Sequence, residues 1–282
     1  MVFPGLVLNP DELGPDPTVG MDLAVALGIR ELEIRTAWGR NALLLDDQQL
    51  DMIRRQAQER GLAVVALASP LWKWCQPESA PGRVDSFGFP TRVPHSERER
   101  WVDRAVEVAG LLGIERVRVF SHLRVEPDLT EDFATDPLLI RALRLAEQAG
   151  MQLLVENEPV CTTATTQAIA AVLERHADAG LRLWLDVANL HELGEDTLAS
   201  VTALASFVNY VHVKDYIPAT GRRKAFCAVG TGVVPYHRVL PILADRAPEA
   251  PWALETHVRD NPRQALTDGA AFLRRQLAKV GA

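Results

Sequence analysis

A glycine between a helical pattern and a short apolar run recurs five times in this chain, at Gly28, Gly61, Gly113, Gly150 and Gly180. Glycine just past a helix end adopts the left-handed cap conformation at little steric cost. The stretches before these glycines carry apolar residues at helical spacing, and the stretches after them are rich in aliphatic residues. A repeated order of helix, glycine and strand is typical of βα units around a parallel sheet.

Eight apolar runs of strand length alternate with the helical patterns. They span residues 2–8, 30–35, 62–68, 115–121, 151–157, 181–186, 208–214 and 251–256. This number of βα units predicts an α/β fold, a (β/α)8 TIM barrel, as a single domain over residues 1–282. An open doubly wound sheet is disfavoured, because no dinucleotide-binding glycine fingerprint follows the first run.

Composition excludes several other classes of protein. The net charge of −7 disfavours a surface for nucleic acid or anionic membranes. The N-terminal sequence lacks the basic region of a signal peptide, and no apolar run approaches the ~18–20 residues of a membrane span. Cys75, Cys161 and Cys227 form no CxxC pair. We therefore expect a cytoplasmic protein that binds neither nucleic acid nor membranes.

Four strand ends in the second half of the chain carry charged or imidazole side chains: Glu156, Asp186, His212 and Glu255. A charged residue at the end of a buried strand is costly unless something pairs with it. Because these ends meet at one face of a barrel, the four residues predict one shared divalent cation. Carboxylates and one imidazole, without thiolate, favour Mn²⁺, Mg²⁺ or Co²⁺, with Zn²⁺ possible.

Each of these residues also has a plain structural interpretation. A lone glutamate at a strand end is ordinarily solvated, and Asp186 followed by Asn189 is ordinarily a helix cap. The metal interpretation therefore depends on all four together. Since side chains two apart on a strand share a face, Glu158, Lys214 and His257 are expected one level higher, toward a bound substrate.

Two connections after strands are longer than packing requires. Residues 71–94 contain Trp72, Trp74, Phe87 and Phe89, and residues 216–235 contain two arginines and the sequence GTG. Both follow strand C-termini, which form the catalytic face of TIM barrels, so lids or substrate walls are expected. The alternative for the aromatic residues is a satellite cluster that pins the first loop.

Six segments carry a resemblance to a known superfamily. They are VRVFSH, LLVENEP, LWLDVANLH, YVHVKD, AVGTGVVPYH and LETH. With them the chain resembles the xylose-isomerase-like TIM-barrel superfamily of sugar and sugar-phosphate isomerases and epimerases, over nearly its whole length. The resemblance implies that Glu156, Asp186, His212 and Glu255 hold one divalent metal ion.

The resemblance also implies the chemistry. It indicates an isomerase or epimerase of a keto-sugar or sugar phosphate, working by proton transfer through a metal-stabilised cis-enediolate. Glu156 and Glu255 would be the catalytic pair, one removing a proton and the other supporting or returning it. The expected partner is a small carbohydrate. Many barrels of this kind are dimers or tetramers, although no segment here identifies an interface.

Substrate contacts are expected from six residues: Glu158, Asn189, Lys214, Arg223, His122 and His257. The alternative for Lys214 is a salt bridge with Asp215 or Asp186, and the alternative for Arg223 is a solvated basic loop. His122 faces the barrel mouth if the register of VRVFSH is as predicted.

Two further features near the expected site have structural interpretations. Glu33 and Arg35 share a strand face and are expected to form a buried pair that steadies the site. The GTG sequence at 230–232 can approach an anion through its backbone N–H groups.

Two other functions stay open, and a third is disfavoured. One is a metal-dependent dehydratase of a keto-inositol or a dehydroshikimate-like substrate, and another is a non-catalytic sugar- or metal-binding barrel. A trinuclear zinc endonuclease of the same superfamily is disfavoured, because Asn189 stands where those nucleases carry histidine and KAFCAVGTG lacks their Asp-x-His pair. Asn189 also departs from several ketose 3-epimerases, which use a histidine there to contact substrate.

Overall fold

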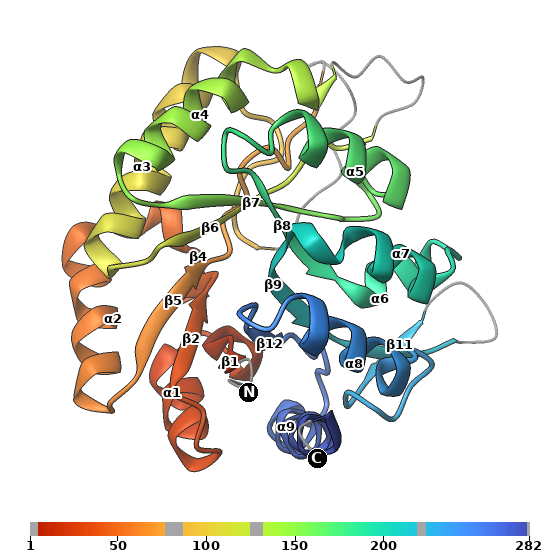
Figure 1. Ribbon diagram of the computed structural model, residues 1–282. Coiled ribbons are helices and arrows are strands. Elements are labelled where there is room, and N and C mark those ends of the chain that lie inside the picture. The colour runs from red at the N-terminus through yellow and green to blue at the C-terminus, as the bar shows by residue number, and fades with distance from the viewer. Residues whose placement is uncertain (1–4, 77–86, 125–131, 219–223, 281–282) are drawn as a thin grey trace.

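Eight parallel strands form a closed barrel in this computed structural model, which describes residues 5–76, 87–124, 132–218 and 224–280 (Figure 1). The strands are β1 (Leu6–Leu8), β2 (Glu31–Ile34), β5 (Ala63–Leu67), β6 (Arg116–Val119), β7 (Gln152–Glu156), β8 (Arg182–Asp186), β9 (Val208–Val213) and β12 (Trp252–Leu254). Each strand lies within the run predicted for it. Pairing of β1 with both β2 and β12 closes the sheet, so the predicted TIM barrel is confirmed.

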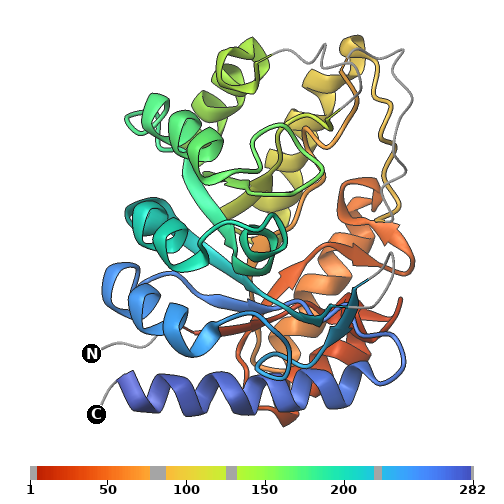
Figure 2. The ribbon, with the colours of Figure 1, turned by 90° about the vertical axis from the view of Figure 1, so that its right-hand side faces the viewer.

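Helices surround the barrel on all sides (Figure 1). They are α1 (Pro17–Ala26), α2 (Asp47–Glu59), α3 (His95–Leu112), α4 (Pro137–Gln148), α5 (Thr166–Arg175), α6 (Val187–Glu192), α7 (Thr197–Leu204), α8 (Tyr236–Arg246) and α9 (Pro262–Val280). Figure 2 shows α9 lying along the outside of the barrel. Among the described residues, no helix combines the length and the apolar character that crossing a membrane requires.

Short 3-10 helices and two small strand pairs lie in the connections between the main elements. The 3-10 helices are η1 (Pro10–Leu13), η2 (Ala42–Leu44), η3 (Phe133–Thr135) and η4 (Ala205–Phe207). Two small antiparallel pairs join β3 (Thr36–Ala37) to β4 (Arg40–Asn41), and β10 (Asp215–Ile217) to β11 (Ala225–Cys227). The second pair lies within the long connection after β9, at the end of the barrel where the strands finish.

The recurring glycines have the predicted conformation. Gly113, for example, follows α3 with φ 72°, and its N–H donates to the carbonyls of Ala109 and Gly110. All five glycines named above have a positive φ, between 64° and 81°. The helix-ending signal therefore sets where each strand begins.

The barrel interior forms a small core of its own. Leu154, Trp184 and Tyr210 are fully buried there, and the Trp184 and Tyr210 rings lie 3.9 Å apart. Because side chains alternate along a strand, Glu156 is two residues past Leu154 and Asp186 two past Trp184, on the same inner face. The polar residues therefore form the layer above this interior core.

The tryptophans of the 71–94 loop are structural. Trp72 and Trp74 are fully buried and stacked with centroids 5.6 Å apart, and Trp72 packs edge-on against Phe133. The Trp72 Nε1–H donates to Asp136 Oδ2 at 2.7 Å. Phe89 packs against Trp101. This supports the satellite-cluster interpretation for three of the four aromatic residues; residues 77–86 of the loop lie outside the described part.

Asp136 makes a testable contribution to stability. Its side chain caps α4 by accepting from the Leu138 N–H, and it also accepts from Trp72. Asp136→Ala should cost about 2–4 kcal/mol, because it removes a cap and leaves a buried indole N–H without an acceptor. Urea unfolding measures this cost. The matched variant Asp46→Ala, which removes the exposed cap of α2, should cost only about 1 kcal/mol.

The same carboxylate predicts a pH dependence. Burial raises the pKa of Asp136, but interactions with His122 and Trp72 outweigh it and hold the pKa below its usual range. A depressed pKa gives stability that is present above the unfolded value of about 3.9 and is lost as pH falls through the folded value. The stability difference between wild type and Asp136→Asn should stay constant above about pH 5 and shrink below about pH 4. A difference that is flat down to pH 3 would contradict this.

Candidate metal centre

The structure brings the four predicted ligands together at the mouth of the barrel. Glu156 and Asp186 end β7 and β8, His212 lies in β9, and Glu255 directly follows β12. All four residues are at most 3% exposed. Ligand atoms of Glu156, Asp186 and His212 lie within 4.8 Å of one another, and Glu255 Oε2 lies 3.3 Å from His212 Nδ1. Neighbouring parallel strands place these ends side by side, with Asp186 in register with His212.

The His212 ring is oriented by Glu33, a residue far from it in the sequence. Its Nε2 lies 2.8 Å from Glu33 Oε2, and because a carboxylate only accepts, Nε2 carries the proton and donates. Its Nδ1 is buried without a hydrogen-bond partner and faces Glu255 and Glu156, 3.3 and 3.8 Å away. A carboxylate that fixes the tautomer of a histidine is typical of metal sites.

Glu33 and Arg35 are both buried, as expected, but their partners differ from the prediction. Glu33 accepts from Asn9 and His212, whereas Arg35 donates to Glu255 at 2.6 Å and to Asp11 and Glu12 of η1. The two side chains steady the site through separate contacts across the barrel. Local patterns could not predict these partners, because one group comes from the segment around η1 and the other from strands near the C-terminus.

Lys214 lies against the ligand carboxylates. Its Nζ is 2.6 Å from Asp186 Oδ2 and 3.3 Å from Glu255 Oε2, so the predicted alternative of a salt bridge with Asp186 is present. Burial alone would lower the pKa of Lys214, but Asp186 and Glu255 raise it well above its usual value. Lys214 is therefore a fixed positive charge that also lines the cavity above.

The two glutamates of the expected catalytic pair differ electrostatically. Burial raises the pKa of Glu156, and the nearby Arg118 offsets only part of this effect. Burial also acts to raise the pKa of Glu255, but the charges of His257, His212 and Lys214 outweigh it and hold it well below its usual value. Two carboxylates whose pKa values are pushed apart are suited to different roles in proton transfer.

A cavity of about 1070 Å³ opens above these ligands. Its lining includes four of the residues predicted to bind substrate: Glu158, Asn189, Lys214 and His257. The Asn189 Nδ2 is buried without a hydrogen-bond partner, so the cavity holds a donor available to a substrate oxygen. Burial raises the pKa of Glu158, but Lys73 and Lys214 outweigh it and lower the pKa, which keeps this side chain anionic.

Of the other two predicted substrate residues, one lies elsewhere and one cannot be placed. His122 is fully buried, 3.6 Å from Asp136 and edge-on to Phe133, and it belongs to the structural cluster under the 71–94 loop. Arg223 lies outside the described residues, as does part of the connection 216–235 around it.

Aromatic side chains form one wall of the cavity. Phe87 and Phe226 both contact the His257 ring, with centroids 6.5 and 5.0 Å away, and Arg35 lies over Phe87 at 4.2 Å. His257 adopts a positive φ of 52°, which is strained for a residue with a Cβ. Phe87 is therefore the aromatic residue of the 71–94 loop that fits the substrate-wall interpretation.

The GTG sequence binds the carboxylate of Asp215, a side chain of the protein itself. Gly230 and Gly232 N–H groups donate to Asp215 Oδ2 at 3.0 and 2.9 Å, and the Val234 N–H donates to Oδ1. A Cβ at Gly232 would lie 2.2 Å from Asp215 Oδ1, which explains the need for glycine. The expected approach to an anion is present, but it fixes the loop after β9.

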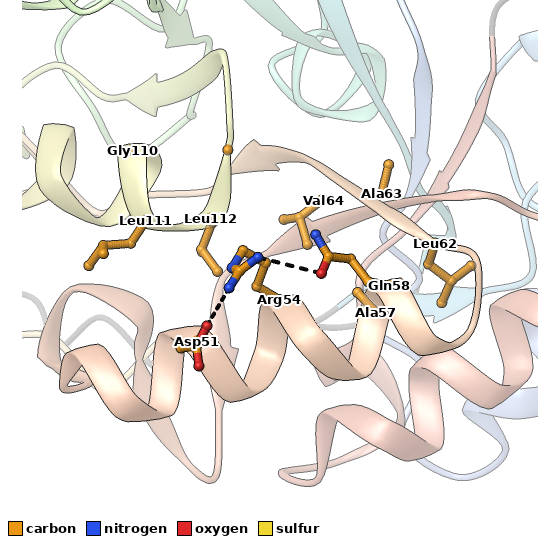
Figure 3. Close-up of a pocket in the computed structure, with 11 residues that line it drawn as sticks. Asp51, Arg54, Ala57, Gln58, Leu62, Ala63, Val64, Gly110, Leu111 and Leu112 are labelled. Atoms are coloured by element: carbon orange, nitrogen blue, oxygen red, sulfur yellow. Dashed lines mark hydrogen bonds and ion pairs between the residues drawn. The ribbon is translucent and has the colours of Figure 1, made fainter.

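A second hollow, of about 700 Å³, lies at the opposite end of the barrel (Figure 3). Figure 3 shows Arg54 on α2 between Asp51 and Gln58, facing Leu112 at the end of α3. The hollow lies beside the start of β5 and away from the ligand side chains. In TIM barrels this end contributes to stability and the other end to chemistry.

The donor set fits a divalent cation. Glu156, Asp186 and His212 form one cluster of possible ligand atoms, Glu255 Oε2 lies 3.3 Å from His212 Nδ1, and this buried nitrogen has no hydrogen-bond partner. Another cluster, Glu12, Glu255 and His257, also approaches metal-binding geometry. Its Glu12 oxygens already accept from Arg35, Thr256 and the His257 N–H. The first cluster is therefore the better metal site.

The sequence profile described as "Xylose isomerase-like TIM barrel" matches residues 21–276, and the chain belongs to this family. A comparison with curated protein sequences gives no match. The predicted superfamily is thereby confirmed.

Three solved structures illustrate the likeness. The probable 3-DHS dehydratase AsbF of Bacillus anthracis has TM-score 0.75 and 15% identity, with 96% of this chain and 98% of that chain covered. The IolI protein with a bound zinc atom has TM-score 0.75 and 16% identity, covering 98% and 99%. The D-allulose 3-epimerase of Methylomonas sp. has TM-score 0.73 and 16% identity, also covering 98% and 99%. At this identity the likeness shows the fold.

His212→Ala should weaken Mn²⁺ binding at least about 100-fold. Removing a residue that only supports a metal ligand commonly lowers metal affinity about 10–100-fold, and this substitution removes a ligand itself. Calorimetric titration of the metal-stripped protein measures this affinity. His176→Ala is the matched control, since His176 is also buried but bonds the Ala134 carbonyl far from the ligands. Undiminished binding by His212→Ala would remove it from the ligand set.

Proposed function

We propose that the protein is a divalent-metal-dependent isomerase or epimerase of a keto-sugar or sugar phosphate. The observation that carries the proposal is the convergence of Glu156 Oε1 and Glu255 Oε2 on His212 Nδ1, at 3.8 and 3.3 Å. Two carboxylates thereby flank one small space, next to a cavity lined by polar donors. A pair of bases on opposite sides of a carbon is what inversion or relocation of a C–H proton requires.

The bound ion would polarise the substrate carbonyl and stabilise the enediolate left when a proton is removed. Glu156 is the group that accepts and returns the proton at Oε1, because Arg118 holds Oε2 while Oε1 faces His212 Nδ1, and burial raises the pKa of this carboxyl. Glu255 stays anionic and orients the other side of the reacting carbon. Lys214 and Asn189 donate to substrate oxygens, and Glu158 accepts from a hydroxyl, since all three line the cavity.

Several properties belong with this proposal. Mn²⁺, Mg²⁺ and Co²⁺ suit the oxygen-rich donor set, and Zn²⁺ is the ion in the related IolI structure. The substrate is a small carbohydrate held beside the Phe87 and Phe226 rings. In the described residues no cysteine forms a disulfide, which suits a reducing cytoplasm. A homo-oligomer remains part of the proposal on grounds of resemblance alone.

The dehydratase alternative shares the first step, and a likeness to AsbF keeps it in the test. Mn²⁺-loaded protein is incubated in D₂O with a panel of ketoses, keto-inositols and their phosphates, and NMR follows carbon-bound protons. Deuterium exchange with formation of an isomer supports the proposal. Loss of water to a new double bond would replace it with the lyase, and no turnover by a metal-loaded protein would favour a binding barrel.

Glu255→Gln should reduce turnover by about 10²–10⁴-fold, the usual contribution of a positioned acid or base. Rates are measured at saturating Mn²⁺, so that any loss of metal affinity does not enter, and circular dichroism checks the fold. Glu31→Gln is the control, because Glu31 is a half-buried glutamate at the other end of the barrel. A wild-type rate in Glu255→Gln would exclude it from the mechanism.

A further inference from the structure

We infer that Arg118 and Arg35 restrict Glu156 and Glu255 to one metal-facing oxygen each, so that the bound ion keeps positions for two neighbouring substrate oxygens. The inference rests on the metal centre of the proposed function. In this inference, two buried arginines control how many protein atoms bind the ion. Neither arginine is itself a ligand.

Arg118 occupies one oxygen of Glu156. Its Nη1 donates to Oε2 at 2.9 Å, while Oε1 faces His212 Nδ1. The guanidinium is itself fixed, because Nη2 and Nε donate to the carbonyls of Ala68 and Ser69. It is 3% exposed and lies over the ring of Phe120, 4.5 Å from its centroid. A donor held on three sides keeps Oε2 occupied when an ion binds at Oε1.

Arg35 does the same for Glu255 from the other side of the barrel. Its Nη1 donates to Oε1 at 2.6 Å, and Oε2 faces His212 Nδ1 at 3.3 Å. Asp11 and Glu12 accept from the remaining guanidinium nitrogens. Phe87 covers the group at 4.2 Å. The Arg35 guanidinium is therefore held on one side by Glu255 and on the other by Asp11 and Glu12.

The third carboxylate follows the same pattern. Asp186 Oδ1 accepts from the Asn189 N–H at 2.9 Å, and Oδ2 lies on the side of the other candidate ligands, 2.6 Å from Lys214 Nζ. Each carboxylate thus has one oxygen held by a fixed N–H donor, the metal-facing oxygens of Asp186 and Glu255 also contact the side chain of Lys214, and His212 offers one nitrogen. An ion that prefers octahedral coordination then keeps about two of its six positions for other oxygens.

This arrangement predicts an ion preference. Ca²⁺ takes about 6–8 oxygen ligands and commonly binds both oxygens of a carboxylate, whereas Mg²⁺ and Mn²⁺ accept octahedral sites with fewer protein donors. Single-oxygen carboxylates therefore disfavour Ca²⁺. Releasing Glu156 from Arg118 allows it to bind with both oxygens and should improve Ca²⁺ binding relative to Mn²⁺.

The experiment compares Ca²⁺ and Mn²⁺ affinities of metal-stripped wild type, Arg118→Met and Arg116→Met by calorimetry. Arg116 is the matched control, two residues earlier on the same face of β6, with its Nε bonded to Asn209. The ratio of the two dissociation constants should shift toward Ca²⁺ by about tenfold or more in Arg118→Met. It should not shift in Arg116→Met. Loss of a positive charge acts on both ions alike, so the ratio reports the donor atoms.

Two further measurements keep the inference open to refutation. In a Mn²⁺- or Ca²⁺-soaked crystal of Arg118→Met, both Glu156 oxygens should contact the ion. If Arg118→Met does not fold, Arg35→Met releases Glu255 and carries the same prediction. An unchanged ratio in a variant that still binds Mn²⁺ would overturn the inference and leave the proposed metal centre standing. Absence of Mn²⁺ binding by the wild type would overturn both.

Discussion

Buried charge at the barrel mouth, and its pairing, is the constraint on which this structure depends. Four buried carboxylates, from Glu33, Glu156, Asp186 and Glu255, meet there. Removing one member of a buried ion pair commonly costs about 3–5 kcal/mol, because the remaining charge is left unpaired. Arg35, Arg118 and Lys214 supply the compensating charge, so the strands that carry them must close into the same ring.

These pairs join parts of the chain that are far apart in sequence. Arg35 and Glu255 are separated by 220 residues, and Glu33 and His212 by 179. Both contacts cross between β2 and the last strands, the region where β1 closes the barrel. These contacts of the site therefore help to close the barrel. Closure of the barrel in turn brings Glu33 to the His212 ring and orients it. Stability and chemistry share the same residues at this end of the barrel.

The candidate ligands and the walls of the cavity come from different kinds of element. The four candidate ligands lie at strand ends, which the barrel fixes, whereas Phe87 and Phe226 lie in the connections after β5 and β9. Loop residues vary without disturbing the ligands. Asn189 stands at the first turn of α6, with a buried amide nitrogen available to the cavity. Under the proposed function, this amide donates to a substrate oxygen.

Local patterns in the sequence determined the barrel and its candidate ligands. Helix-ending glycines, apolar runs and charged residues at strand ends are features of a few consecutive residues, and they located the eight strands and Glu156, Asp186, His212 and Glu255. The ligand convergence follows from the fold class, because parallel strands of a barrel end at one face.

Only the tertiary structure decided which charges pair. The partners of Glu33 and Arg35 lie across the closed ring, whereas Arg118 meets Glu156 on the neighbouring strand and GTG holds Asp215 within the connection after β9. His122 likewise follows a strand end as the sequence indicated, yet it packs under the 71–94 loop beside Asp136. The physical reason is that a side chain's face is set by its own strand, whereas its partner is set by how other parts of the chain, near or far in the sequence, pack against that strand.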